Sequence, residues 1–323
     1  MIELRHDELV FTCRDVHPQA KLTVGFQRTL RIPDDGRDYP LPPSLGEFPL
    51  RHVDDFSTRL PALWSKRGGV MLPMYQSEAM WVNLGGQYPF ALKIATGKIN
   101  AVTGEDWVDG LHRDPQDYMT TPDQPWLDGY CVEKGTIRQF VAMPLGGGFT
   151  AEEQITGKAE HGGLQIVAYP MKAEAYRDLQ LEERGAVYDM GMPSVPEMCV
   201  SAPPDMGLAP GGRMKQEIYD DPHAFDVWDT RAGSRCFVHI ANSVQWRAVT
   251  TEESPTRPLT AREYTDAGLP WFEYYGGDAE VLGGAKKLAG LKTVKEIGEE
   301  KGEHPLPENE SVDGQVRIVL GEK

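Results

Sequence analysis

Residues 22–32 read LTVGFQRTLRI, and apolar side chains occupy alternate positions of this stretch. This period of two predicts a β-strand with one buried face. Arg28 is the one charged residue among the apolar positions. It is expected at a sheet edge or in an internal ion pair, and the less favoured alternative is an arginine that faces a ligand.

Strand signals recur along the rest of the chain. They fall at residues 90–95, 99–103, 130–133, 136–143, 164–169, 236–248 and 316–320. The first four form two consecutive pairs, each separated by a short turn that contains glycine, as in β-hairpins. The 34 glycines and 25 prolines also favour frequent turns and short strands over long helices.

Helix signals are short by comparison. Three capping boxes begin at Thr150, Thr260 and Thr293, each with a glutamate three residues later. Residues 173–184 show the one longer amphipathic pattern. We therefore expect a mainly β fold, either a β-sandwich or an open barrel with short capped helices, and an α+β fold is the alternative.

One segment interrupts the regular pattern. Residues 190–212 are rich in methionine, proline and glycine, which is typical of a connection between structural units. The sequence therefore predicts two β-rich lobes, residues 1–189 and 213–323, joined by this segment. A single continuous domain is the alternative.

Charge and composition exclude several classes of partner. The chain has 33 Lys and Arg against 49 Asp and Glu, a net charge of −16. It offers no basic cluster for nucleic acid or an anionic membrane surface, and no apolar run long enough for a membrane-spanning helix. Its beginning lacks the features of a signal peptide, and its four cysteines are widely spaced. We expect a soluble cytoplasmic protein with reduced core thiols and no cofactor.

The segment Gly146–Ala151 formally matches the glycine-rich turn of dinucleotide-binding proteins. It follows a predicted strand and opens a helix, where free N–H groups suit a phosphate. Against this function, Glu152 and Glu153 place negative charge in the first helical turn, and Gly157 ends the helix too early for a crossover. An ordinary strand–turn–helix joint is the favoured interpretation, and nucleotide binding is an alternative.

An acidic cluster follows the predicted connection. Asp220, Asp221 and His223 are weak candidates for a hard-cation site. Asp221 followed by Pro222 is more typical of a helix N-cap with proline at the first helical position, which is the favoured interpretation.

Sulfur-containing residues gather in the same region. They are Met190, Met192, Met198, Cys199, Met206 and Met214. Such soft donors could bind copper(I), but methionine is more often an adaptable apolar filler, which is the favoured interpretation.

The segment Asp123–Tyr130 places Trp126 among carboxylates and an amide. Such a surface can stack a sugar ring and bond its hydroxyl groups, although a tight turn with a buried tryptophan is more common. If the protein is a carbohydrate-active hydrolase, its paired carboxylates are expected among Asp123, Asp128, Asp226 and Asp229.

Four segments resemble a widespread set of uncharacterised bacterial and fungal proteins. They are residues 124–129, 138–146, 153–157 and 206–212, and the resemblance extends from about residue 26 to residue 275. It implies a self-contained globular protein and carries no activity or catalytic residue.

These observations favour a non-catalytic protein that binds a small molecule or its own copies through its loops. The residues expected to contact a ligand are Trp126, Arg138, Gly146, Gly148, Thr150 and Gln154. The alternatives are the hydrolase and the nucleotide-binding protein. No nucleophile or histidine lies in a sequence context that indicates catalysis.

Overall fold

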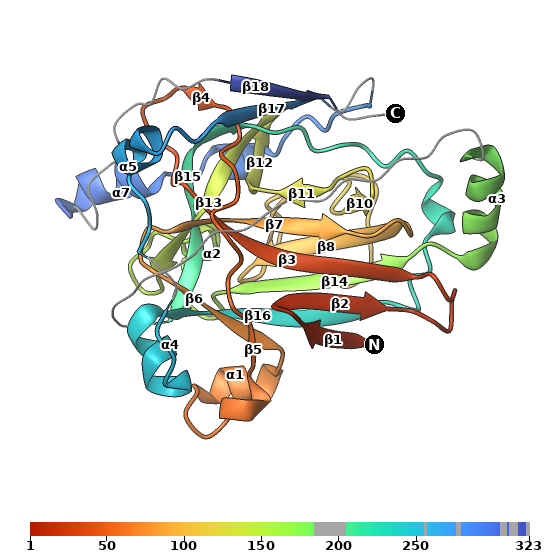
Figure 1. The fold of residues 1–323 in the computed structure, drawn as a ribbon, viewed down its shortest axis with the longest axis horizontal. Coiled ribbons are helices and arrows are strands. Elements are labelled where there is room, and N and C mark those ends of the chain that lie inside the picture. The colour runs from red at the N-terminus through yellow and green to blue at the C-terminus, as the bar shows by residue number, and fades with distance from the viewer. Residues whose placement is uncertain (184–204, 255–256, 276–278, 304–308, 310–315, 321–323) are drawn as a thin grey trace.

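A computed structural model describes residues 1–183, 205–254, 257–275, 279–303, 309 and 316–320. One large and mostly antiparallel sheet dominates these residues (Figure 1), so the mainly β prediction is confirmed. Its strands are β1 (Ile2–Arg5), β2 (Glu8–Thr12), β3 (Lys21–Thr29), β4 (Asp38–Tyr39), β5 (Arg51–His52), β6 (Val70–Met74), β7 (Ala79–Gly85), β8 (Phe90–Thr96), β9 (Ile99–Asn100), β10 (Met119–Thr121), β11 (Trp126–Leu127), β12 (Gly129–Glu133), β13 (Thr136–Pro144), β14 (Leu164–Pro170), β15 (Met206–Lys215) and β16 (Ser234–Asn242).

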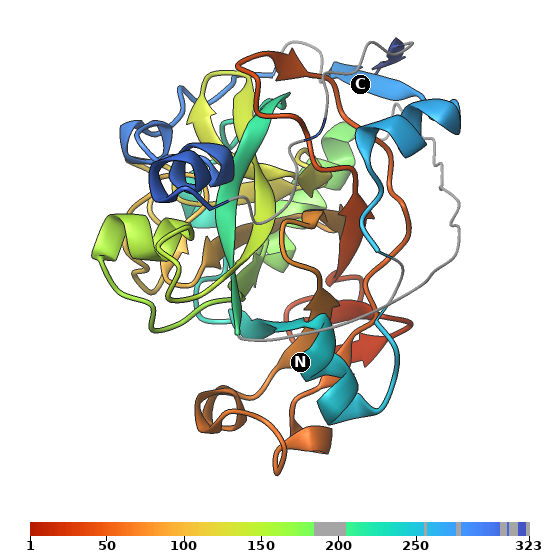
Figure 2. The same cartoon turned by 90° about the vertical axis from the view of Figure 1, so that its left-hand side faces the viewer.

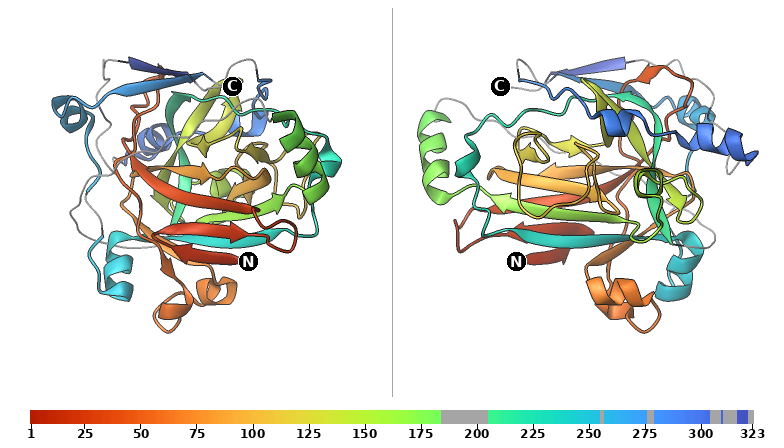
Figure 3. Two further views of the ribbon diagram at one scale, coloured as in Figure 1. Left: turned by 45° about the vertical axis from the view of Figure 1, so that its right-hand side comes forward. Right: turned by 180° about the vertical axis from the view of Figure 1, so that it is seen from behind.

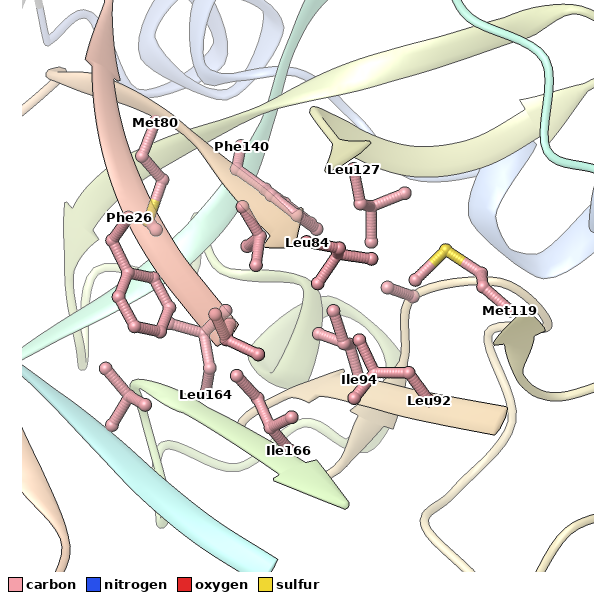
Figure 4. Close-up of a cluster of buried hydrophobic side chains, with 14 of the residues drawn as sticks. Phe26, Met80, Leu84, Leu92, Ile94, Met119, Leu127, Phe140, Leu164 and Ile166 are labelled. Carbon is pink, nitrogen blue, oxygen red and sulfur yellow. The ribbon is translucent and has the colours of Figure 1, made fainter. Parts of the chain in front are cut away.

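The main path of the sheet runs β1-β2-β3-β7-β13-β15-β16-β14-β8-β10. The sheet rolls up, so that apolar side chains from β3, β7, β8, β13 and β14 point into one shared interior (Figure 4). The chain itself links the two flanks, since β10 pairs with β8 and the next strand, β11, pairs with β7. This arrangement corresponds to the open-barrel form of the prediction, with side chains filling the interior.

The helices are short and lie around this sheet. They are α1 (Ala62–Arg67), α2 (Ala151–Thr156), α3 (Ala173–Glu183), α4 (Ser243–Thr250), α5 (Ala261–Asp266), α6 (Lys286–Ala289) and α7 (Val294–Lys301), with 3-10 turns at Asp54–Phe56 and Phe225–Val227. Helices α1 and α4 lie together on one side (Figure 2), and α3 and α7 lie at opposite ends (Figure 3). All three predicted capping boxes are present, with both reciprocal hydrogen bonds. A separate two-stranded parallel sheet joins β17 (Trp271–Tyr275) to β18 (Val316–Leu320).

The strand predicted at residues 236–248 is confirmed for residues 236–242 and wrong for residues 243–248, which are helical. Strand β16 ends at Asn242, whose side chain accepts hydrogen bonds from the backbone N–H groups of Val244 and Gln245. That cap starts α4, and the helix then buries Trp246 and Val249 on one face. The alternate apolar residues fit a strand pattern. The Asn242 cap and the three-residue spacing of Trp246 and Val249 instead produce a helix.

The predicted connection at residues 190–212 is also corrected in part. Residues 206–212 belong to β15, in the middle of the sheet between β13 and β16. Their glycines permit close packing: a Cβ on Gly212 would lie 2.5 Å from the carbonyl oxygen of Pro33. Strands from both sides of the proposed boundary share this sheet, which favours the single-domain alternative. Residues 190–204, with four members of the sulfur cluster, lie outside the described residues.

Other expectations from the sequence can be placed directly. Arg28 makes an internal ion pair, with its Nε 3.1 Å from Oε1 of the buried Glu78. Cys13, Cys131 and Cys236 are buried free thiols, while Cys199 lies outside the described residues. None of the helices that the structure describes has the length and hydropathy of a membrane-spanning segment.

Candidate functional site

The outer face of β3, β7 and β11 presents two rows of side chains. Strand register places Gln27 opposite Trp81, and it places Asn83 between Gly25 and Trp126. The alternate residues of these strands, such as Val82 and Leu127, are fully buried in the core. The tryptophans therefore extend to the other face of these strands, and both are partly exposed, although Trp126 also packs against the core.

A small pocket opens beside this face. We call it the Trp126 pocket; it is lined by Leu41, Gln124, Pro125, Trp126, Lys215, Gln216, Glu217 and Tyr219. Its empty space is about 250 Å³ when the solvent at its mouth is included. Two backbone hydrogen bonds to Phe272, of 2.7 and 2.8 Å, hold Leu41 at the pocket wall. The pocket thus combines residues from three distant parts of the chain.

Two glutamine amides form the polar frame of the pocket. The Nε2 groups of Gln124 and Gln216 both donate to the carbonyl oxygen of Trp126, at 3.1 and 3.2 Å. Their Oε1 atoms accept from the backbone N–H groups of Tyr219 and Asp128, at 3.1 and 3.0 Å. The side-chain amides of Gln124 and Gln216 therefore fix the backbone around Trp126, and the pocket is preformed in the absence of a ligand.

Asp128 follows β11, bonds the pocket residue Gln216 through its backbone N–H group, and is only 2% exposed. Its Oδ2 atom has no hydrogen-bond partner in the structure. Burial raises the pKa of the Asp128 carboxyl from 3.8 to about 7, although a hydrogen bond with the Trp126 side chain opposes the shift. The indole Nε1 of Trp81 is likewise buried and without a partner.

The residues predicted to contact a ligand do not meet at one site. Trp126 lines the pocket, whereas Arg138 Nη1 on β13 lies 3.4 Å from the carbonyl oxygen of Gly211 and 3.7 Å from Asp34. Gln154 bridges α2 to residue 292, donating to the carbonyl oxygen of Lys292 and accepting from its N–H group. Of the three, only Trp126 belongs to the pocket.

The glycine-rich turn is occupied by the protein itself. The Glu153 carboxylate accepts from the N–H groups of Gly146, Gly148 and Thr150, at 2.7, 2.9 and 3.2 Å. The Thr150 hydroxyl donates to the same carboxylate at 2.8 Å. A phosphate would have to displace this carboxylate, so the turn offers no free nest for a nucleotide.

The four candidate catalytic aspartates each make separate contacts. Asp123 Oδ2 lies 4.0 Å from His223 Nε2, while Asp128 contacts the frame of the Trp126 pocket. Asp229 accepts from the N–H group of Arg231 in a turn, and the backbone oxygen of Asp226 accepts from Lys172. None of these contacts joins two of the four carboxylates.

The weak metal candidates lie next to Asp123. The Asp221 carboxylate accepts from the Tyr118 hydroxyl at 2.6 Å and from the Trp228 indole at 2.9 Å. It also accepts from the N–H group of His223 at 2.9 Å, and Arg113 lies 3.5 Å away. These donors use the lone pairs of the Asp221 carboxylate. Among the described residues, which include Asp220, no three or more His, Cys, Asp or Glu side chains form a group that could hold a metal ion.

The expected helix N-cap at Asp221 is wrong. The following 3-10 turn, residues 225–227, starts after Ala224. Asp221 instead bonds the backbone two residues ahead, as aspartate does in turns.

Sequence reasoning missed Trp81, Gln216 and two histidine contacts. His161 Nδ1 lies 2.7 Å from Glu152 Oε1, and His239 Nε2 lies 3.0 Å from the carbonyl oxygen of Gly68. Burial lowers the pKa of His239 to about 4, so this histidine is neutral and structural. The two residues of each contact are 9 and 171 positions apart, so no short sequence motif indicates them. Trp81, by contrast, lies in a segment whose alternating pattern could have been predicted as a strand.

No protein-family model, curated protein or solved structure matches this chain. The choice of a function therefore rests on the geometry of the Trp126 pocket.

Proposed function

We propose that this protein binds a small molecule in the Trp126 pocket without transforming it. The observation that carries the proposal is the partly exposed indole of Trp126 at the wall of a concave site. The backbone of this site is held by the side-chain amides of Gln124 and Gln216, which both donate to the carbonyl oxygen of Trp126. Binding sites typically combine an apolar wall with a few fixed polar groups. The enclosed space is only about 10 Å³, far below the usual range of roughly 300–1,000 Å³, so a ligand inserts no more than one small group.

The polar groups at the pocket support binding more than chemistry. Lys215 and Glu217 bring opposite charges to its lining, and Gln124 and Gln216 are already bonded to backbone. Nucleophilic catalysis needs an activated nucleophile beside a base. The eight residues that line the pocket include no serine, threonine, cysteine or histidine.

A thermal-shift screen with small neutral and charged molecules tests the proposal. A ligand of the pocket should raise the melting temperature of the wild-type protein and of the control Trp107→Ala, but not that of Trp126→Ala. Trp107 packs over Lys93, away from the pocket lining. A screen without any hit, or a hit that Trp126→Ala preserves, would contradict the proposal.

A carbohydrate-active hydrolase is the second candidate, and the pKa of Asp128 favours it. A carboxyl with a pKa of about 7 can act as a general acid near neutral pH. Hydrolysis of chromogenic glycosides by the wild type, lost in Asp128→Asn, would make this the leading function. Absence of turnover across a broad glycoside panel would remove it.

A cytoplasmic location and self-association are also proposals. Three buried free thiols, Cys13, Cys131 and Cys236, fit a reducing compartment. Self-association is tested by size-exclusion chromatography with light scattering, where a strict monomer at all concentrations would exclude it.

A further inference from the structure

Residues 54–67 leave the sheet after β5 and return to it at β6. We call this segment, which contains the first 3-10 turn and α1, the α1 arm; it projects from the sheet beside α4 (Figure 1). The N–H group of Val53 donates to the carbonyl oxygen of Gly69 at 3.0 Å and closes the base of the arm. The pairing of β5 with β6 lies outside this closure, so the arm is a surface loop whose ends meet.

The arm has little stability of its own. Within residues 54–67, all of which the structure describes, Trp64 is the one buried residue. Neither the 3-10 turn nor α1 has a side-chain N-cap, in contrast to the capping boxes of α2, α5 and α7. Helices this short are marginal in water without tertiary contacts. The arm therefore stays closed because of its contacts with the rest of the molecule.

Two of these contacts converge on His239 of β16. The Trp64 indole stacks on the imidazole, with ring centroids 4.6 Å apart and planes inclined by 22°. His239 Nε2 donates to the carbonyl oxygen of Gly68, the C-cap of α1, at 3.0 Å. Under this cover His239 is only 3% exposed. One imidazole thus holds both the buried side chain of the arm and the end of its helix.

The other contacts of the arm are made by arginines, which stay charged at every relevant pH. Arg59 Nη1 donates to the carbonyl oxygen of Val249 at 3.1 Å. Arg67 lies over the Phe237 ring, and its Nη1 donates to the carbonyl oxygen of His161 at 3.4 Å. These bonds do not change with pH, which leaves His239 as the titratable contact of the arm.

Charged groups approach His239 from three directions. They are Arg67 at the end of α1, Arg235 on the same face of β16 with its partner Asp109, and His161 before β14 with its partner Glu152. The two acids are engaged by their own partners, at 3.2 and 2.7 Å. From β6 and α4, apolar side chains reach the cluster around Trp64. The surroundings therefore favour a neutral imidazole.

We infer that the α1 arm is an acid-sensitive flap, closed while His239 is neutral and opened when His239 takes up a proton. In the open arm the imidazole loses its Trp64 cover and its bond to Gly68. Opening also leaves the apolar side chains of Met71 and Trp246 without Trp64. This inference is independent of the Trp126 pocket, whose lining includes no residue of the arm.

The direction of the switch follows from the proton affinity of each state. Burial lowers the pKa of His239 from 6.5 to about 4 in the closed arm; the Gly68 carbonyl opposes this shift and the charge of Arg67 adds to it. In the open arm the solvated imidazole returns to its ordinary pKa of 6.5. The open state therefore binds the proton more tightly, and opening becomes easier as pH falls from about 6.5 towards 4.

Hydrogen exchange of the full chain at pH 7.5 and pH 5, followed by mass spectrometry, tests the inference. The amides of Trp64, Ser65 and Gly68 report on the arm, because each donates to a carbonyl oxygen within it. Each rate is divided by that of an unprotected amide at the same pH. The informative variant is His239→Gln, which keeps an N–H donor and does not titrate. His52→Gln, at an exposed histidine of β5 beside the arm, is the matched control.

We expect exchange in the arm to rise about tenfold or more between pH 7.5 and pH 5 in the wild type and in His52→Gln. His239→Gln should show no such rise. The amides of α7 should stay protected in all three proteins, because the opening is local. If His239→Gln does not fold, titration of the wild-type imidazole by NMR replaces it, and His239 should titrate well below its ordinary pKa of 6.5.

The opposite results would overturn the inference. They are arm exchange that does not rise at pH 5, a rise that persists in His239→Gln, and a wild-type His239 that titrates at 6.5 or above. A rise shared by α7 would also overturn it, since acid would then loosen the whole chain and not the arm.

Discussion

At the scale of single residues, the most consequential feature of the core is the Arg28–Glu78 ion pair. Both side chains are almost fully buried, and the guanidinium also lies over the Phe48 ring. Burial raises the pKa of Glu78 to about 7, while Arg28 opposes the shift. Glu78 further accepts from the N–H group of Tyr75 at 2.9 Å. The pair joins β3 to the start of β7 at one end of the interior.

We predict that Arg28→Met lowers the free energy of unfolding by about 3–5 kcal/mol, because it leaves Glu78 buried without its cation. The double variant Arg28→Met/Glu78→Met should lose less than the sum of the two single variants. Urea denaturation measures all three. Lys292→Met, which breaks an exposed pair with Glu300, is the control and should cost about 1 kcal/mol or less. Additive losses at Arg28 and Glu78 would contradict this account.

Asp128 predicts a pH dependence of stability. Its pKa is raised from 3.8 to about 7, so the folded protein binds this proton more tightly than the unfolded chain. The stability that this group contributes is therefore greatest at low pH and is lost as pH rises through about 7.

Asp128→Asn should match the wild type only below about pH 4 and exceed it at pH 8 by about 1–4 kcal/mol, since the loss builds up between the two pKa values and one pKa unit is worth about 1.4 kcal/mol. Melting curves across this pH range measure the difference. Asp55→Asn, at an exposed position, is the control and should shift the curve equally at both pH values. A wild type that is more stable than Asp128→Asn at pH 8 would show that the carboxylate is stabilised in the fold.

At the scale of elements, the capping boxes were readable from the sequence because they are local. Each needs only a threonine and a glutamate three residues apart. What the pattern could not show is the further task of Glu153, which also holds the N–H groups of Gly146 and Gly148. The turn before α2 is thus closed by the cap of that helix.

We predict that Glu153→Ala destabilises the protein by about 2 kcal/mol, roughly twice the effect of Glu296→Ala. Glu153 accepts four hydrogen bonds, from three backbone N–H groups and one hydroxyl. Glu296, in the equivalent box of α7, accepts from the N–H group of Thr293. Chemical denaturation of both variants measures the difference, and equal losses would mean that the glycine turn adds nothing.

At the scale of the whole molecule, the path of the sheet predicts that the two expected lobes do not fold separately. Strands β15 and β16 lie between β13 and β14, so a fragment of residues 1–189 would lack the centre of its own sheet. We expect fragments 1–189 and 213–323 to show no cooperative melting alone, while the full chain melts in one transition. Circular dichroism during heating measures this. A cooperative transition in either fragment would restore the two-lobe description.

The sequence alone determined the class of the fold and the positions of its hairpins and capping boxes. Alternation at residues 22–32 and the hairpins at 90–103 and 130–143 depend on neighbours along the chain, and the structure contains both hairpins. The boundary at Asn242 was missed because alternate apolar residues fit the end of a strand and the face of a short helix equally.

Only the tertiary structure decided the candidate site. Trp126 could be proposed from its own segment, but its pocket also needs Leu41 and Gln216, which lie far away in the chain. The register of a rolled sheet brings these residues together, and register depends on how the whole core packs. Local composition sets the elements, whereas the partners of buried polar groups are set by strands far apart in the chain.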